Sequence, residues 1–153
     1  MSYPHTCHQI HELVQAPKVV RENARLQVEK YGEHGGKFDV HLDVVGREFF
    51  DVRYLGKATD QSKPDGYEAN LILAGYRVRG VGHNHVGRNN LRAKQRIPAG
   101  WHQNKVDPNL PTSHVEYNYH EPLPHFTPTD FGDFIGKCAR LWTIDLQTPE
   151  VLV

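Results

Sequence analysis

The sequence is poor in the features that mark exported, membrane-spanning or disulfide-bonded proteins. Its two cysteines, Cys7 and Cys138, lie far apart and form no CxxC pair, so reduced thiols are expected although a disulfide between them is an alternative. Residues 1–10 lack the basic and apolar regions of a signal peptide. The longest purely apolar run, Leu71–Ala74, is too short to span a bilayer. We therefore expect a cytoplasmic protein without a membrane association.

The common nucleotide-binding and hydrolase motifs are absent as well. The chain has no P-loop, no GxGxxG, no GxSxG and no HExxH. The Gly80-Val81-Gly82 stretch resembles part of a phosphate-binding loop, but no helical pattern follows it. This argues against nucleotide binding of the Rossmann kind.

Acidic residues are also absent from a long central stretch, between Ala69 and Val106. The same stretch carries seven basic residues: Arg77, Arg79, Arg88, Arg92, Lys94, Arg96 and Lys105. With 18 basic and 18 acidic residues the whole chain is formally neutral, so the remainder carries the compensating negative charge. A local positive field of this kind suits an anionic, phosphate-bearing ligand.

The length of 153 residues, with 38% hydrophobic and 24% charged residues, is typical of a single soluble domain spanning residues 1–153. Apolar spacing predicts a short helix over residues 8–14, ended by Pro17. Alternating apolar residues predict strands at residues 24–28, 38–44, 50–54, 67–73 and 76–81, with a final short strand at 115–119. The three runs from residue 24 to residue 54 read as an antiparallel meander with one buried face.

The C-terminal region predicts an amphipathic helix. Thr127 is expected at the N-cap, Pro128 at the first helical position and Asp130 in the first turn. One apolar stripe follows at helical spacing: Phe131, Phe134, Ile135, Cys138, Leu141 and Trp142. Cys138 is therefore interpreted as a core residue. The predicted fold is α+β, a curved antiparallel sheet of about five or six strands packed on this helix.

Residues 82–111 form a basic segment without a regular apolar pattern, rich in Gly, Asn and Pro. An irregular segment of this length in a compact domain is usually functional or mobile. We interpret it as the basic rim of a pocket, and Arg77 and Arg79 as a clamp on one face of the preceding strand.

A histidine motif lies at the junction of that strand and the basic segment. In His83-Asn84-His85 the two imidazoles are expected on one side of an extended chain, and His102 follows after a loop. Two histidines can share the roles of general base and general acid in metal-independent cleavage of RNA or another phosphodiester. His83, His85 and His102 are thus the candidate catalytic residues. The candidate ligand-binding residues are Arg77, Arg79, Asn84, Arg88, Arg92, Arg96 and Trp101.

Two other interpretations stay open. The same three histidines, with an outside ligand from Asp107, His114, Glu116 or His120, could hold zinc, although seven nearby cations oppose a dication. Alternatively, the protein binds or sequesters RNA or a nucleotide without catalysis, and Trp101 stacks on a base.

These motifs resemble those of the TumE-type toxins of bacterial toxin–antitoxin systems. The matching pieces are Tyr76-Arg77-Val78-Arg79, His83-Asn84-His85, Ile97-Pro98 through Trp101-His102, and Thr127-Pro128 with the helix after it. The resemblance covers roughly residues 36–143. It implies a small, positively charged effector that acts on RNA or a nucleotide and has a cognate antitoxin as its protein partner.

Overall fold

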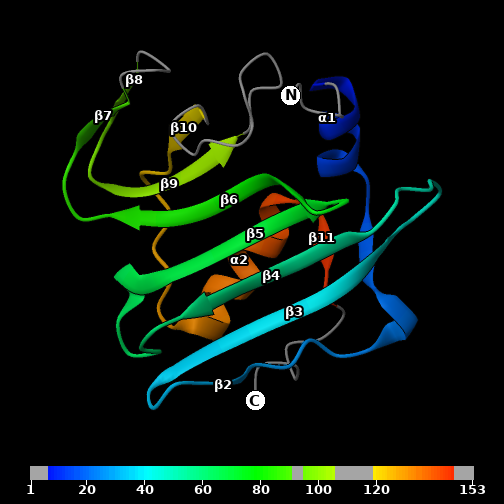
Figure 1. Cartoon of the computed structure of the whole chain (residues 1–153), viewed down its shortest axis with the longest axis horizontal. Helices are drawn as coiled ribbons and strands as arrows, with labels where there is room; N and C mark the ends of the chain where they lie inside the picture. The colour runs from blue at the N-terminus through cyan, green and yellow to red at the C-terminus, as the bar shows by residue number, and fades with distance from the viewer. Residues whose placement is uncertain (1–6, 91–94, 106–118, 147–153) are drawn as a thin grey trace.

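The computed structural model describes residues 7–90, 95–105 and 119–146, in which a large sheet packs against a C-terminal helix (Figure 1). The helices are α1 (Cys7–Gln15) and α2 (Phe131–Leu141), with 3-10 turns η1 (Arg21–Asn23) and η2 (Pro64–Gly66). The strands are β1 (Lys18–Val20), β2 (Glu29–Tyr31), β3 (Gly35–Val44), β4 (Val52–Ala58), β5 (Tyr67–Leu73), β6 (Tyr76–Asn84), β7 (Arg88–Asn90), β8 (Gln95–Ile97), β9 (Gly100–Lys105), β10 (Tyr119–Pro122) and β11 (Ile144–Asp145).

Among the described residues, the main sheet has nine strands in the order β10-β9-β6-β5-β4-β3-β1-β11, with β2 also paired to β3. All its pairs are antiparallel except β1 with β11. This confirms the α+β class and the curved sheet packed on a C-terminal helix. The predicted number of about five or six strands is too small. Four of the additional strands, β1, β2, β10 and β11, have only two to four residues, too short to show an alternating pattern.

Strands β3 to β6 form the antiparallel meander at the centre of the sheet. Side chains such as Phe38, Tyr54 and Leu71 alternate inward and are buried in the core. The strand predicted from residue 50 begins instead at Val52. Phe50 is 82% exposed in the turn before it, so its apolar character does not mark a strand.

Helix α2 covers one face of this sheet and lies behind the strands in Figure 1. The predicted stripe is buried except for Leu141, and Cys138 is fully buried, which confirms it as a core residue. The N-cap is Asp130 rather than Thr127. Its carboxylate accepts a 2.7 Å hydrogen bond from the backbone N–H of Asp133, which a residue three positions earlier cannot reach.

Helix α1, predicted over residues 8–14, is confirmed, and a buried lysine holds its C-terminal end. The Lys18 ammonium donates to the carbonyls of Leu13, Val14 and Ala16. Burial lowers the pKa of Lys18 to about 8. Lys18 therefore ties the end of α1 to the first strand of the sheet.

Residues 24–28, predicted as a strand, form no ladder, and β2 begins only at Glu29. The alternation there reflects burial, because Leu26 is fully buried and Val28 packs against the core while their neighbours face outward. Apolar alternation reports which side chains are buried, and it does not require a hydrogen-bonded partner strand.

The described part of the segment 82–111, which leaves out residues 91–94 and 106–111, is more regular than predicted. Strand β6 continues to Asn84, β7 and β8 pair in a small separate sheet, and β9 pairs with β6 from Gly100 to Lys105. Strand β9 has no apolar alternation, because one of its inward residues is Gln103, whose side-chain oxygen accepts a 2.7 Å hydrogen bond from the Trp142 indole. Residues 106–111 of this segment lie outside the described residues, as do 115–118 of the last predicted strand; Tyr119 begins β10.

Candidate ligand-binding site

The face of the sheet opposite α2, called here the outer face, carries a hollow of about 320 Å³. We name it the β6 trough because it lies along β6, between β5 and β9. Seven polar or charged residues border it: Asp65, Glu68, Asn70, Arg77, His83, His102 and Asn104. Three of these, Arg77, His83 and His102, are among the residues predicted from the sequence. The trough is close to the lower end of the range for small-ligand pockets, about 300–1,000 Å³.

Two glycines of β6, Gly80 and Gly82, lie on this part of the outer face, and Gly82 borders the hollow. Gly80 lies in register between Asn70 of β5 and Asn104 of β9, and Gly82 pairs with His102. A side chain at Gly80 would collide with Asn70, whose Oδ1 lies 2.8 Å from the position of an added Cβ, and would approach Arg77 Cδ at 3.5 Å. The Asn70 side chain therefore covers Gly80, whereas Gly82, where an added Cβ would lie 3.6 Å from the His102 ring, leaves space beside that ring.

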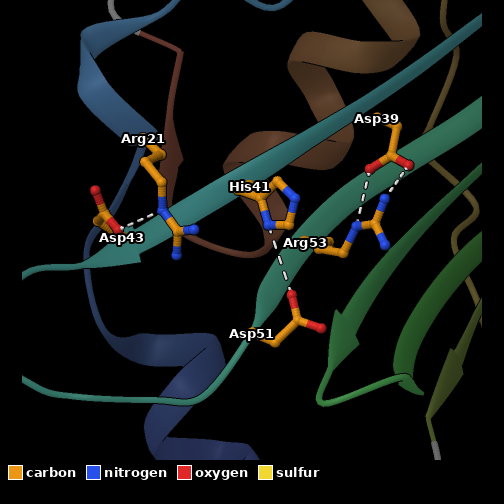
Figure 2. Close-up of polar contacts among 6 residues, drawn as sticks. All are labelled: Arg21, Asp39, His41, Asp43, Asp51 and Arg53. Atoms are coloured by element: carbon orange, nitrogen blue, oxygen red, sulfur yellow. Dashed lines mark hydrogen bonds and ion pairs between the residues drawn. The ribbon is translucent and has the colours of Figure 1, made fainter.

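Arg77 is the cation of the trough. The paired ions of the opposite end of the outer face, on and beside β3 and β4, provide a contrast (Figure 2). There Arg53 pairs with Asp39, Arg21 Nε lies 3.2 Å from Asp43 Oδ1, and His41 lies 3.5 Å from Asp51.

Within the described ranges, Arg77 makes no such ion pair with a carboxylate. It is half-buried, and burial lowers the pKa of Arg77 while the charge of Glu68 opposes this shift. A partly desolvated guanidinium without an ion-pair partner favours an anion supplied by a ligand.

The predicted clamp of Arg77 and Arg79 is wrong, because a β-bulge lies between them. Arg77 pairs with Ile72 and Arg79 with Leu71, so the two arginines point to opposite faces of the sheet. Arg79 donates a 2.8 Å hydrogen bond to the backbone carbonyl of Val78. Only Arg77 of this pair borders the trough.

The three candidate histidines do not form one cluster. His83 and His85 have ring centroids 5.6 Å apart, which confirms that they project to the same side. His102 pairs with Gly82 and stands next to His120, at 5.1 Å between ring centroids, on the outer face. Since His83 pairs with the inward-facing Trp101, strand alternation places the His83 and His102 rings on opposite sides of the sheet, although both residues border the trough.

This separation bears on the zinc alternative. Across residues 7–90, 95–105 and 119–146, no group of three or more His, Cys, Asp or Glu side chains is placed to hold a metal ion. Three of the four outside ligands considered from the sequence lie outside the described residues: Asp107, His114 and Glu116. Zinc binding stays a prediction.

In the part of the chain that the structure describes, none of the other predicted ligand-binding residues is among those that border the trough. Arg88 lies in β7 and Arg92 lies outside the described residues. Arg96 in β8 is exposed and donates a 3.4 Å hydrogen bond to Asn89. Trp101 packs against Phe126 and Phe134 with ring centroids 5.2 and 5.5 Å away, so its ring is part of the aromatic core rather than an exposed stacking surface.

In space, the stretch without acids has acidic neighbours from other strands and turns. Lys105 pairs with Glu121 of β10 at 2.7 Å, and His85 lies 3.5 Å from Asp65 of η2. Glu68 lies at the trough and 3.8 Å from Lys57. The positive field expected from the sequence is therefore partly compensated among the described residues, while Arg77 at the trough has no carboxylate paired with it there.

Several buried polar atoms near the trough have no hydrogen-bond partner in the described part of the chain. They include His83 Nδ1 and Asn84 Nδ2 on β6 and Asn104 Oδ1 on β9. Buried polar groups in folded proteins are normally satisfied by protein, water or ligand. Of these residues, His83 and Asn104 border the trough; Asn104 lies opposite Gly80, whereas Asn84 lies opposite Gly100 at the other end of β9.

Sequence reasoning did not find Asn70, Asn104, Asp65 or Glu68 as site residues. Glu68 and Asn70 are the outward positions of a correctly predicted strand, so alternation identifies their face. Alternation does not identify the strand register, which places Gly80 opposite Asn70 of β5 on one side and opposite Asn104 of β9 on the other.

Comparisons of this chain with protein-family models, with curated proteins and with solved structures give no match. The resemblance to TumE-type toxins stays a prediction. Neither of the helices α1 and α2 of the described residues is long and apolar enough to cross a membrane.

Proposed function

We propose that the protein binds a phosphate-bearing ligand, RNA or a nucleotide, in the β6 trough, and cleaves RNA there by histidine acid–base chemistry. The observation that carries the proposal is Arg77, a half-buried guanidinium that borders the trough and has no carboxylate paired with it among the described residues. A phosphate oxygen is the partner that such a group binds best.

The cleavage step needs a base and an acid next to the bound phosphate. The 2′-oxygen of the ribose attacks phosphorus as its proton passes to one imidazole. The bond from phosphorus to the 5′-oxygen then breaks, and a second imidazole protonates that oxygen, leaving a 2′,3′-cyclic phosphate. His102 borders the trough from the outer face and supplies one imidazole, while Arg77 stabilises the charge on the phosphorane. The His83 ring lies on the other side of the sheet, so the candidate for the second imidazole is His120, whose ring centroid lies 5.1 Å from that of His102.

A binding protein without catalysis is the second candidate. Two observations favour it: the rings of His83 and His102 lie on opposite sides of the sheet, and Asp65 and Glu68 add negative charge to the trough. The two candidates share the phosphate contact of Arg77 and differ only in turnover. The cytoplasmic location, the toxin role and the antitoxin partner stay predictions.

The test compares Arg77→Ala with Arg53→Ala, an arginine of the same outer face that is already paired with Asp39. A labelled single-stranded RNA is titrated by fluorescence anisotropy, and cleavage is followed on a gel. Loss of a charge-assisted contact weakens binding by about 10- to 100-fold in Arg77→Ala, while Arg53→Ala stays near wild type.

If both variants bind RNA as the wild type does, or if the wild type does not bind RNA or mononucleotides at all, the proposal is wrong. Binding that depends on Arg77 without any cleavage selects the binding protein over the nuclease. The melting temperature of each variant shows that the fold is retained.

A further inference from the structure

A chain of side-chain contacts joins the end of α2 to β9 and β10 on the inner face of the sheet, the face that α2 covers. The Trp142 indole donates a 2.7 Å hydrogen bond to Gln103 Oε1, and the amide nitrogen of Gln103 donates to Glu121 Oε1 at 3.4 Å. The second carboxylate oxygen of Glu121 lies 2.7 Å from the Lys105 ammonium. These four residues are called here the inner bridge.

Gln103 places a polar amide where the core is otherwise apolar. It is 7% exposed, and Trp142 is fully buried. An apolar residue at this position would need no hydrogen-bond partner, whereas a buried amide is costly unless its oxygen and its nitrogen both have one. Both atoms of the Gln103 amide have partners within the inner bridge. A satisfied buried network of this kind specifies one arrangement of the elements that it joins.

Strand β10 depends on such a contact for its register. Among the described strands of the main sheet it lies at one edge, it has four residues, and the last of them, Pro122, has no N–H to donate. A shift of one residue would turn every side chain of β10 to the other face. Glu121 lies directly opposite Gln103, so the inner bridge closes only in the observed register.

The two proposed imidazoles are the chain neighbours of two bridge residues. His102 precedes Gln103 on β9 and His120 precedes Glu121 on β10, so alternation places both imidazoles on the outer face. His120 pairs with Asn104, two residues beyond His102, which makes the histidines diagonal neighbours across the two strands. Both are buried, with ring centroids 5.1 Å apart. The ring contact therefore requires the same register as the inner bridge.

We propose that Gln103 and Glu121 are positioning residues: the inner bridge holds β10 in register on β9 and so keeps His102 and His120 together for the proton transfers of RNA cleavage. This inference rests on the proposed function and adds to it residues on the opposite face of the sheet. Because they face away from the trough, they act through the two histidines rather than on the RNA.

The experiment compares Glu121→Ala, Glu121→Gln and Asp43→Ala with the wild type. The nuclear Overhauser effect between the His102 and His120 rings is measured on the free protein, and single-turnover cleavage and affinity are measured with a labelled RNA. We expect Glu121→Ala to lose the ring contact and to slow cleavage by about 100-fold without weakening RNA binding. Glu121→Gln, whose amide oxygen still accepts the hydrogen bond, restores both. Asp43→Ala removes the carboxylate of an exposed ion pair on β3 and keeps both.

If the wild type cleaves RNA, persistence of either the ring contact or the cleavage rate in Glu121→Ala overturns the proposal, and so do equal losses in Asp43→Ala. If the wild type shows the ring contact and cleaves no RNA, the cleavage function fails, while loss of the contact in Glu121→Ala still supports the positioning of the two rings. The Glu121 side chain is 39% exposed, so we expect its variants to fold. Should Glu121→Ala melt early, Glu121→Val, which favours a strand, repeats the test.

Discussion

At the scale of single residues, we propose different roles for Arg77 and His102 in the β6 trough. Arg77 supplies fixed charge, since its guanidinium has no paired carboxylate among the described residues. His102 supplies a group that can exchange protons and lies within the trough, paired in register with Gly82. Substitutions at the two positions should therefore have separable effects on affinity and on turnover.

We predict that His102→Gln lowers the rate of RNA cleavage by about 100- to 10,000-fold and leaves RNA affinity nearly unchanged. Glutamine keeps much of the size and hydrogen-bonding capacity of histidine but does not exchange a proton near neutral pH. Single-turnover cleavage and anisotropy on the same RNA separate the two quantities.

His41→Gln is the matched control, because His41 lies on the same outer face next to Asp51 (Figure 2), on β3, which β4 separates from the strands of the trough. Equal losses of cleavage in both variants would contradict a specific role for His102. Unchanged cleavage in His102→Gln would remove this histidine from the mechanism.

Single residues of the site were predictable where their chemistry is distinctive. Arg77, His83 and His102 stand out in a sequence because basic and imidazole side chains without nearby acids are unusual. Asn70 and Asn104 do not stand out, since an amide is common in turns and strands. Their importance depends on a cross-strand register that no local pattern encodes.

At the scale of elements, the connection between α1 and β1 depends on a buried charge. Lys18 is fully buried and its ammonium donates to backbone carbonyls at the end of α1, which are otherwise left without helical partners. The amine thus acts as a cap that belongs to the neighbouring strand. Its proton is held less tightly in the fold than in the unfolded chain, because burial lowers the pKa of Lys18 to about 8.

We predict that Lys18→Met changes how stability depends on pH. Between pH 8 and about 10.4, where a lysine of the unfolded chain still binds its proton, the unfolded state binds more protons than the fold, so Lys18 makes the free energy of unfolding rise with pH. Below pH 8 the full cost of the buried charge is present. Urea unfolding at several pH values should show wild-type stability rising relative to Lys18→Met across this interval.

The wild type is compared with Lys18→Met because other groups titrate in a similar pH range. Burial raises the pKa of Tyr54 and of Cys138, so these groups lower stability at alkaline pH in both proteins and cancel in the difference. A constant difference in stability between wild type and variant across the interval would contradict the account of Lys18.

The elements that could be predicted are those with apolar periodicity. The α2 stripe and the inward residues of β3 to β6 have it, and these elements were found. Strand β9 lacks it, because Gln103 takes an inward position and satisfies its amide on Trp142. A buried polar residue interrupts the apolar alternation from which a strand is predicted. For this reason β9, which borders the trough, was not predicted from the sequence.

At the scale of the whole molecule, folding brings acidic side chains next to the basic stretch, which contains none in the sequence. The basic stretch receives Glu121, Asp65 and Glu68 from β10, η2 and β5, and the paired ions of β3 and β4 occupy the other end of the outer face (Figure 2). Among the described residues that border the trough, Arg77 is then the cation, and it has no paired carboxylate there. The salt dependence of RNA binding should accordingly be shallow, with a slope near −0.7 for each phosphate neutralised.

The central claim is that a phosphate-bearing ligand lies in the β6 trough against Arg77. A titration of ¹⁵N-labelled protein with AMP, followed by NMR, tests it most directly. We predict that the largest shifts occur at the backbone amides of Gly80 and Gly82 and at Arg77 Nε, and that Arg77→Ala abolishes them. Shifts confined to residues of β3 and β4 such as Arg53, or no shifts at millimolar AMP, would contradict the claim.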